Sequence, residues 1–406
     1  MNTANLSTAS LPLREDVTTI SLVGLAHASS HFSHLLLPLL FPVFAVEFGL
    51  SYSELGLLMS IFFVLSGVGQ ACAGFAVDRL GARGLLFLAI VLLAFACLAA
   101  SVAGGYGGLM VAAALAGLGN ATFHPVDFTI LNQRVSAARL GYAFSAHGLT
   151  GNLGWAAATV FIASLSSAYG WRVAYQAAAF MYVLILLVLL VYRDYLVTQP
   201  SHHPAQKGDA PREHAMAFMK LPVVWWCFAF FLLSTMTFAV VQSFSVSILK
   251  AMYGVGFEAA TFTLTAYMLA GAVGMFIGGI VATRVQSSDR VVALAMTVGA
   301  VCLALCGTGW LNANITMIVL AATGFAIGIG GPSRDMMIKK ASPKGATGRV
   351  YGLVYSGLDT GFALSPLLFG ALMDHGLYGT TLIGAAAILL LSVFAALGVG
   401  TRTRHA

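Results

Sequence analysis

Charged side chains are scarce in this sequence. Asp, Glu, Lys and Arg together make up 8% of its 406 residues, whereas a soluble globular protein carries roughly 25%. This shortage argues against a water-soluble fold. Hydrophobic residues account for 59% of the chain, and its mean hydropathy is +0.90. Because a membrane-spanning helix needs about 20 mostly apolar residues, the composition predicts an all-α integral membrane protein with about a dozen spans.

Several marks of other protein classes are missing. The five cysteines lie in apolar stretches without CxxC spacing, so we expect neither a disulfide framework nor a zinc site built on cysteines. The Lys and Arg residues behind the net charge of +6 form no basic face, which argues against nucleic-acid binding. The N-terminal region has no signal-peptide pattern, so we expect the first span to remain in the mature protein. We expect no cofactor and no resident metal.

Twelve apolar segments predict twelve transmembrane helices, at residues 17–46, 52–77, 84–102, 107–132, 140–165, 172–193, 221–250, 258–283, 290–310, 314–339, 350–372 and 380–400. A polar stretch containing Pro200, Pro204 and Pro211 separates the sixth segment from the seventh and is typical of a linker. The predicted organisation is an N-terminal six-helix bundle (1–193), a cytoplasmic linker (194–220) and a C-terminal six-helix bundle (221–406).

The positions of the basic residues predict the orientation. With both termini in the cytoplasm, every Lys and Arg falls on the cytoplasmic side except Arg172, Lys250 and Arg334. Cytoplasmic connections of membrane proteins are enriched in Lys and Arg. We therefore expect a multi-pass protein of the bacterial inner membrane with both termini inside, in contact with membrane lipid.

The two halves of the chain repeat each other. Gly49 and Gly254, Gly69 and Gly274, and Arg79 and Arg284 are each separated by 205 positions, so the register holds across the second span. Duplicated six-helix halves are a common plan of membrane transporters. Two pseudo-symmetric bundles would enclose a central cavity, and we expect the substrate path to lie there.

The loop after the second span carries a recognisable motif. Residues 74–83 read GFAVDRLGAR, which resembles the G-x-x-x-D-R-x-G-x-R signature of the major facilitator superfamily. The resemblance implies that fold and a latch between the halves that closes one face, formed here by Gly74, Asp78, Arg79, Gly81 and Arg83, with Arg134 nearby. The alternative is a positively charged loop that only sets topology. The second copy departs from the pattern, with Thr283 at the acidic position and Gln286 at the later glycine position.

Two further segments indicate which branch of the superfamily the sequence resembles. Residues 117–125 (GLGNATFHP) and 145–154 (SAHGLTGNLG) are similar to the fosmidomycin-resistance branch of the superfamily, whose members export a phosphonate antibiotic or related small molecules. We expect a glutamate two positions after the His-Pro of this branch. In this sequence Val126 and then Asp127 follow Pro125, so the glutamate is replaced. The resemblance implies a small-molecule exporter.

Histidines form a stripe on the first helix. His27, His31 and His34 are spaced at i, i+4 and i+7, so they share one face of a helix, and Pro38 and Pro42 should bend the helix beyond them. Three interpretations stay open: a face for proton relay or substrate contact, a path for a transition metal, or hydrogen-bonded packing. Histidine changes charge near neutral pH, which suits proton coupling.

His124 and Asp127 form a second candidate site. They share a face of the fourth helix beside the kink expected at Pro125, and a carboxylate next to an imidazole raises the proton affinity of the pair. We therefore interpret both as proton-coupling residues. The alternative is that Asp127 lies at the cytoplasmic end and pairs with Arg134.

The C-terminal half has its own ionisable groups within spans, where each is costly and therefore expected to face the cavity. Arg334 is the predicted contact for an anion, because its planar guanidinium suits a carboxylate or phosphonate. Asp335 and Asp359 are further proton-coupling candidates. The alternative for Arg334 and Asp359 is an ion pair between helices. Asn152, Gln242 and Tyr267 are candidate neutral contacts for the substrate.

Together these patterns predict a secondary transporter, working as a monomer, that moves a small anionic or polar organic solute by alternating access. We expect coupling to protons, with export slightly favoured. The alternative cargo is a transition metal or metal chelate, suggested by the histidine stripe. A different class, an intramembrane metalloenzyme with a histidine box, fits less well because few other histidines cluster. The sequence contains no GxxxxGK[ST] loop, so we do not expect ATP to drive transport.

Overall fold

The computed structural model describes residues 12–199, 217–285, 287–341 and 347–403, and all regular structure in these ranges is helical. The long helices are α1 (Leu13–Leu36), α3 (Tyr52–Leu80), α4 (Ala82–Ser101), α5 (Tyr106–Asn120), α6 (Phe123–Arg134), α7 (Leu140–Tyr169), α8 (Trp171–Val191), α9 (Pro222–Tyr253), α10 (Phe257–Arg284), α11 (Ser288–Gly307), α12 (Ala313–Ala341), α13 (Thr347–Asp374) and α14 (Tyr378–Thr403).

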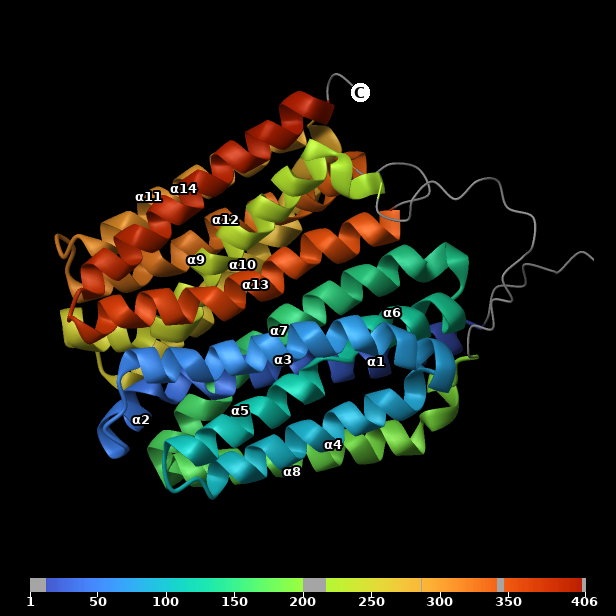
Figure 1. Cartoon of the computed structure of the whole chain (residues 1–406), viewed down its shortest axis with the longest axis horizontal. Helices are drawn as coiled ribbons and strands as arrows, with labels where there is room; N and C mark the ends of the chain where they lie inside the picture. The colour runs from blue at the N-terminus through green and yellow to red at the C-terminus, as the bar shows by residue number, and fades with distance from the viewer. Residues whose placement is uncertain (1–11, 200–216, 286, 342–346, 404–406) are drawn as a thin grey trace, which may run out of the picture.

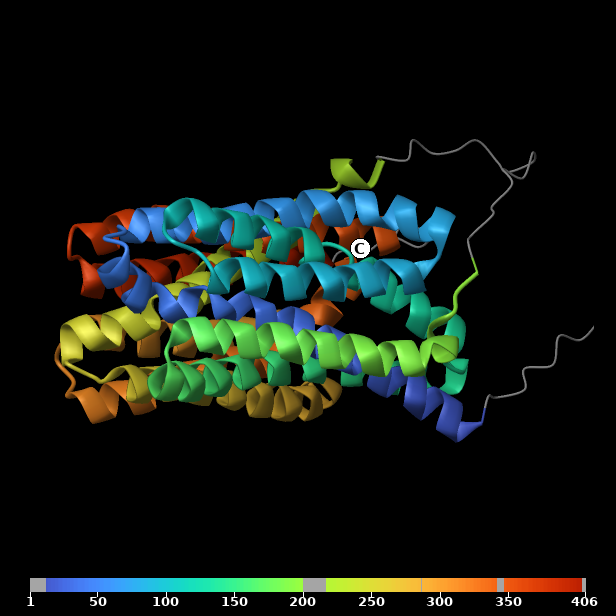
Figure 2. The same cartoon turned by 90° about the horizontal axis from the view of Figure 1, so that it is seen from below.

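Figures 1 and 2 show these helices running roughly along one axis, with the first half of the chain packed beside the second. Eleven spans in the described residues are long and apolar enough to cross a membrane. Helix α13, a continuous helix of 28 residues that contains Asp359 and Pro366, supplies the twelfth crossing. The prediction of two six-helix halves in an all-α membrane protein is confirmed. We call the end where α8 finishes and α9 begins the linker end, and the other the far end.

Proline breaks two of the spans where the sequence predicts bends. The first span is divided into α1, the short helix η1 (Pro38–Leu40) and α2 (Phe41–Glu47). The fourth is divided into α5 and α6 by a turn at 121–122. Pro125 has no N–H to donate, so the helical hydrogen bond to the carbonyl of Ala121 is missing. The break lets α6 take its own direction, which matters for the site it carries.

The two halves meet along α3 and α13, which lie side by side in Figure 1. Glycines bring the backbones together, since a methyl group at Gly56 would clash with the carbonyl of Pro366, and one at Gly370 would lie 2.7 Å from the carbonyl oxygen of Tyr52. Ser60 Oγ donates to the carbonyl of Ala363 at 2.5 Å. These contacts hold the halves together over the part of α3 nearest the far end.

Candidate functional site

Three helices of the first half bring a group of histidines together. His27, His31 and His34 come from α1, His124 from α6 and His147 from α7. The ring centroids follow one another at 3.5 Å between His147 and His27, 4.4 Å between His27 and His31, and 5.1 Å between His31 and His34. The predicted stripe on α1 is therefore the middle of a longer row of imidazoles. Sequence reasoning gave no role to His147, although it belongs to the 145–154 segment.

Asp127 lies at the linker-end part of this row and is fully buried. Its Oδ2 atom is 3.1 Å from His147 Nε2, in a hydrogen bond, and 3.2 Å from His27 Nδ1, without hydrogen-bonding geometry. Its Oδ1 atom has no partner within the described ranges. A buried carboxylate is stable only when it is paired or protonated. The two imidazoles thus give Asp127 a proton to share.

The alternative that Asp127 pairs with Arg134 is wrong. Arg134 lies two turns further along α6, where its Nη2 donates to the backbone carbonyl of Asp194 at 3.3 Å. The side chain of Asp127 instead turns toward α1 and α7, where it meets His27 and His147.

The row ends in a fixed histidine. Trp155 Nε1 donates to His34 Nδ1 at 3.3 Å, and His34 Nε2 lies 3.0 Å from Asn120 Oδ1. An indole N–H can only donate, so His34 Nδ1 must accept, and the proton of a neutral imidazole sits on Nε2. Asn120 is held in turn by Ser30 and Ser66. His34 is therefore a neutral, oriented hydrogen-bonding group in this conformation.

His124 lies beside the row, and His31 is one of its middle members. His124 Nδ1 lies 3.1 Å from Oε1 of Gln70 on α3. His31 packs its ring against Trp155, with a centroid distance of 4.3 Å, and its Nδ1 has no hydrogen-bond partner among the described residues. Gln70, Asn120 and Trp155 were not predicted, because nothing in their local sequence indicates which helix they face.

Glycines on α7 make room for the α1 histidines. A methyl group at Gly151 would lie 2.7 Å from His31 Cε1 and 3.1 Å from His27 Nε2, and one at Gly154 would clash with the backbone of Ala28. Close backbone approach through small residues is a common way for membrane helices to pack. The imidazoles of the row can stack only because these positions lack a side chain.

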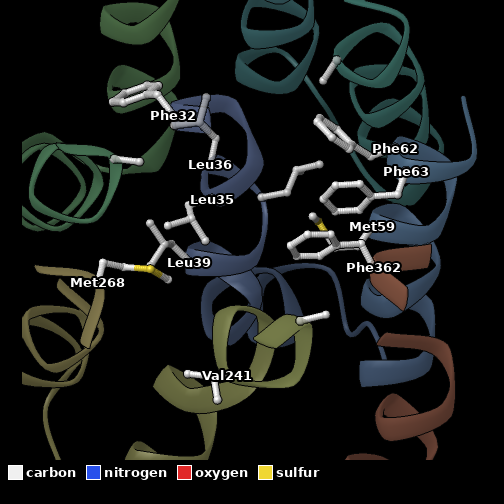
Figure 3. Packing of buried hydrophobic residues seen from close by; sticks show 14 of the residues in the cluster. Phe32, Leu35, Leu36, Leu39, Met59, Phe62, Phe63, Val241, Met268 and Phe362 are labelled. Atoms are coloured by element: carbon white, nitrogen blue, oxygen red, sulfur yellow. The ribbon is translucent and has the colours of Figure 1, made fainter. Parts of the chain in front are cut away.

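An apolar layer closes the far side of His34. Figure 3 shows Phe63 from the first half against Phe362 from the second, with Phe62 on the other side of Phe63 and Met59 beside the pair. The rings of Phe63 and Phe362 stack with centroids 4.3 Å apart and planes inclined by 10°. This layer separates the histidines from the far end.

Other predicted residues lie apart from the histidines. Arg334 Nε pairs with Asp335 Oδ1 of the same helix at 2.9 Å, and its guanidinium lies 5.0 Å from the ring centroid of Phe231. Asp359 faces α3, where a methyl group at Gly67 would lie 3.3 Å from its Cβ. Among the residues with described side chains, Asp359 makes no ion pair. The predicted alternative of an Arg334–Asp359 pair is wrong, because Asp335 is the nearer carboxylate.

The three neutral candidates lie on the inner surfaces of both halves. Asn152 Nδ2 donates to the carbonyl of Gly148 and lies 3.9 Å from Met275 Sδ, across the interface between α7 and α10. Gln242 and Tyr267 are buried, and each leaves one polar atom, Nε2 and the hydroxyl respectively, without a partner in the described structure.

The predicted latch motif lies at the linker end. Gly81 ends α3 with a φ of +79°, and the amide of Ala82 donates to Thr198 Oγ1 at 2.8 Å. Arg79 is exposed, Arg83 is half-buried, and nothing surrounds Gly74 within 4 Å on its side-chain face. The side chain of Asp78 lies outside the described residues. In this conformation the described part of the motif is not packed against the second half.

The far end carries a contact that the sequence did not indicate. Asp374, at the end of α13, accepts hydrogen bonds from the backbone N–H groups of Tyr52 at 2.5 Å and Ser53 at 3.0 Å, and from Ser53 Oγ at 2.5 Å. These groups form the N-terminus of α3, where free N–H groups and the helix dipole attract an anion. A carboxylate of the second half thus closes the far end by capping a helix of the first half.

Comparisons with known proteins agree with this architecture. The sequence model of the Major Facilitator Superfamily matches residues 23–287 and 241–406. The fosmidomycin resistance protein of Escherichia coli K12 is 23% identical over 290 residues, which cover 70% of this chain and 69% of that protein. A probable 4-methylmuconolactone transporter of Cupriavidus pinatubonensis is 28% identical over 177 residues, covering 43% of this chain and 40% of that one.

Solved structures share the fold at low identity. A bacterial homologue of the human lysosomal transporter Spinster, in an inward-facing and occupied conformation, matches with a TM-score of 0.76 and 13% identity over 95% of this chain and 97% of its own. A mutant of the nucleoside transporter NupG matches with a TM-score of 0.77 and 13% identity over 94% and 99% of the two chains.

The packing at Gly151 generates a testable prediction. Gly151→Ala should destabilise the protein by about 1–3 kcal/mol, because the added methyl overpacks the space of His31 and His27. Gly148→Ala, one turn earlier, meets nothing within 4 Å and should leave stability unchanged or slightly raised. Thermal unfolding of the two variants in detergent measures the difference, and equal melting temperatures would contradict the described packing.

The contact between Asp374 and the N-terminus of α3 leads to a second testable prediction. Hydrogen bonds to a charged group are worth about 1.5–3 kcal/mol, so Asp374→Asn should shift the population toward opening of the far end by about tenfold or more. Spin labels at Val46 and Trp310, which are exposed at the far end of opposite halves, should then report a longer distance component in pulsed electron paramagnetic resonance. Glu258→Gln, which neutralises an exposed carboxylate at the same end, should leave the distances as in the parent protein.

Proposed function

The chain belongs to the major facilitator superfamily, whose members are membrane transporters of small molecules rather than enzymes, and from this premise we propose that it couples proton movement to the transport of a small anionic or polar organic solute. The transporter would work by alternating access, in which two bundles rock about a central site. Membership of this family sets aside the intramembrane metalloenzyme.

The main support for proton coupling is the arrangement of side chains around Asp127. The carboxylate is fully buried, yet both imidazoles next to it can exchange a proton with it. Their row leads from the linker-end side toward His34, whose two nitrogens are engaged, and stops at the layer of Phe62, Phe63 and Phe362. We propose that a proton on this row is exchanged with the linker-end side in this conformation, because the aromatic layer packs against the last histidine of the row.

Arg334 is the proposed contact for an anionic cargo. Its side chain keeps 29% of its surface exposed and pairs with Asp335, which is itself 48% exposed. A carboxylate or phosphonate of the cargo would compete with Asp335 for the guanidinium and could bind it through two parallel hydrogen bonds. The names of two relatives, the probable 4-methylmuconolactone transporter and the probable nitrate transporter NarT of Staphylococcus carnosus, support a small polar or anionic cargo. Likeness to a resistance protein favours export.

The proposed orientation is based on the charge distribution, and the proposed latch is based on the resemblance of the 74–83 loop to the superfamily signature. The basic residues of the described loops gather at the linker end, which we place in the cytoplasm of a bacterial inner membrane. The structure would then be cytoplasm-facing, with Asp374 and the aromatic layer closing the outer side. In the opposite state the loop motif of Arg79 and Arg83 would engage the second half and close the cytoplasmic side. We propose that a single chain surrounded by lipid carries out the cycle.

Flux measurements test the coupling. In proteoliposomes with an imposed pH gradient, wild-type protein should drive accumulation of one member of a panel of anionic metabolites and antibiotics. Asp127→Asn keeps the size of the side chain but cannot carry the proton, so gradient-driven flux should fall by about 100-fold or more, while solute exchange without a gradient persists. Glu258→Gln serves as the control. Wild-type flux that ignores the gradient would remove the proton-coupling assignment.

The anion contact has its own test. Arg334→Ala removes charge-assisted hydrogen bonds worth about 1.5–3 kcal/mol, so KM for the transported anion should rise by about 10- to 100-fold. Arg290→Ala, at an exposed arginine at the start of α11, should leave KM unchanged. If both variants transported every anion of the panel like the wild type, Arg334 would not be the contact.

A further inference from the structure

The histidine cluster holds more ligand atoms than a proton relay uses, and we infer that His27, His31 and His124 form a binding site for one divalent transition-metal ion of the zinc type. The inference depends on the geometry of these side chains and not on the nature of the proposed cargo. The ion would lie between α1 and α6, beside Asp127.

The ligand atoms are already gathered. One ring nitrogen from each of the three histidines lies within 4.8 Å of the other two, and a second group formed by His27, Asp127 and His147 meets the same limit. In a tetrahedral zinc site with bonds of about 2.0–2.1 Å, neighbouring ligand atoms are about 3.3 Å apart. Small rotations of the imidazoles would therefore complete the site without moving a helix.

Unpartnered nitrogens are the second observation. His27 Nδ1 and His31 Nδ1 are buried without a hydrogen bond in the described structure, as is Asp127 Oδ1. A buried polar atom without a partner is costly, and native proteins leave few of them. The three unpartnered atoms of this cluster therefore favour a bound ligand that supplies the missing interactions.

A neighbouring side chain orients His124 as metal sites require. Gln70 Oε1 accepts a hydrogen bond from His124 Nδ1, so the lone pair of His124 is on Nε2. A hydrogen bond to the other ring nitrogen is the usual support of a metal-binding histidine. Asp127 is placed to act as a fourth ligand or to orient His27 and His147. His34 is excluded, because Trp155 and Asn120 occupy both of its nitrogens.

The ligand set decides the class of metal. Imidazole nitrogens with at most one carboxylate suit Zn²⁺, Co²⁺ and Ni²⁺, whereas Mg²⁺ and Ca²⁺ prefer sites built from oxygen atoms. The metal groups of the described residues contain no cysteine, so the site lacks the thiolates that select softer ions. Metal and protons would compete for the same lone pairs, and binding should weaken as the pH falls.

Metal titration of the purified full-length protein tests the inference. Co²⁺ should produce the visible absorption of a site with nitrogen ligands at one ion per chain, Zn²⁺ should displace it, and Zn²⁺ should raise the melting temperature while Mg²⁺ does not. His31→Gln and His124→Gln should each weaken the metal by about 100-fold or more. His375→Gln, which removes an exposed histidine after α13, should bind like the wild type.

Two further measurements keep the result unambiguous. If one glutamine variant unfolds without metal, the Co²⁺ titration of the other decides, because His31 and His124 lie on different helices. Loading proteoliposomes with radioactive zinc then separates a metal on the transport path, which accumulates, from a metal that only occupies the cluster and blocks proton-driven flux. Both outcomes support the site. Absence of a Co²⁺ spectrum, or equal affinity in the wild type and both glutamine variants, would overturn it, whatever the flux of organic solutes.

Discussion

The whole arrangement depends on the cost of placing a carboxylate in the dry interior of a helical bundle. Asp127 is fully buried, and a charge there is tolerated only beside groups that can neutralise it. That requirement brings His27 from α1 and His147 from α7 to the same point. The break before α6 at Pro125 and the bare backbone at Gly151 are the means by which three helices come close enough to satisfy it.

The far end of the protein and its linker end are closed by different kinds of contact. The far end is closed by Asp374, which binds backbone N–H groups and the Ser53 hydroxyl of α3, and by the stacking of Phe63 on Phe362. Such contacts are strong when formed and leave solvated groups when broken, so they suit a gate that must open repeatedly. The latch proposed for the linker end would instead use the charged side chains of Arg79 and Arg83, and attraction between exposed charges is weakened by water and salt.

Periodicity and composition predict the elements of this protein, but they do not predict how each helix is rotated about its axis. The His27, His31 and His34 stripe, the twelve spans and the bends at Pro38 and Pro125 are read from spacing and from the chemistry of proline. The partners Trp155, Asn120 and Gln70 come from other helices, and no local pattern fixes which way they point. The alternative of an Arg334–Asp359 pair was wrong for a related reason, because the guanidinium pairs with the adjacent Asp335 instead.

The glycine contacts between α3 and α13 have a mechanical consequence. Where Gly56 meets the backbone of Pro366 and Gly370 meets that of Tyr52, the two helices touch without interlocking side chains. Interdigitated residues would have to disengage before one half could turn against the other, with a barrier at each step. At these two points the backbones themselves form the contact, so in the proposed rocking movement they could slide past one another, and a bulky residue at Gly56 would obstruct that movement.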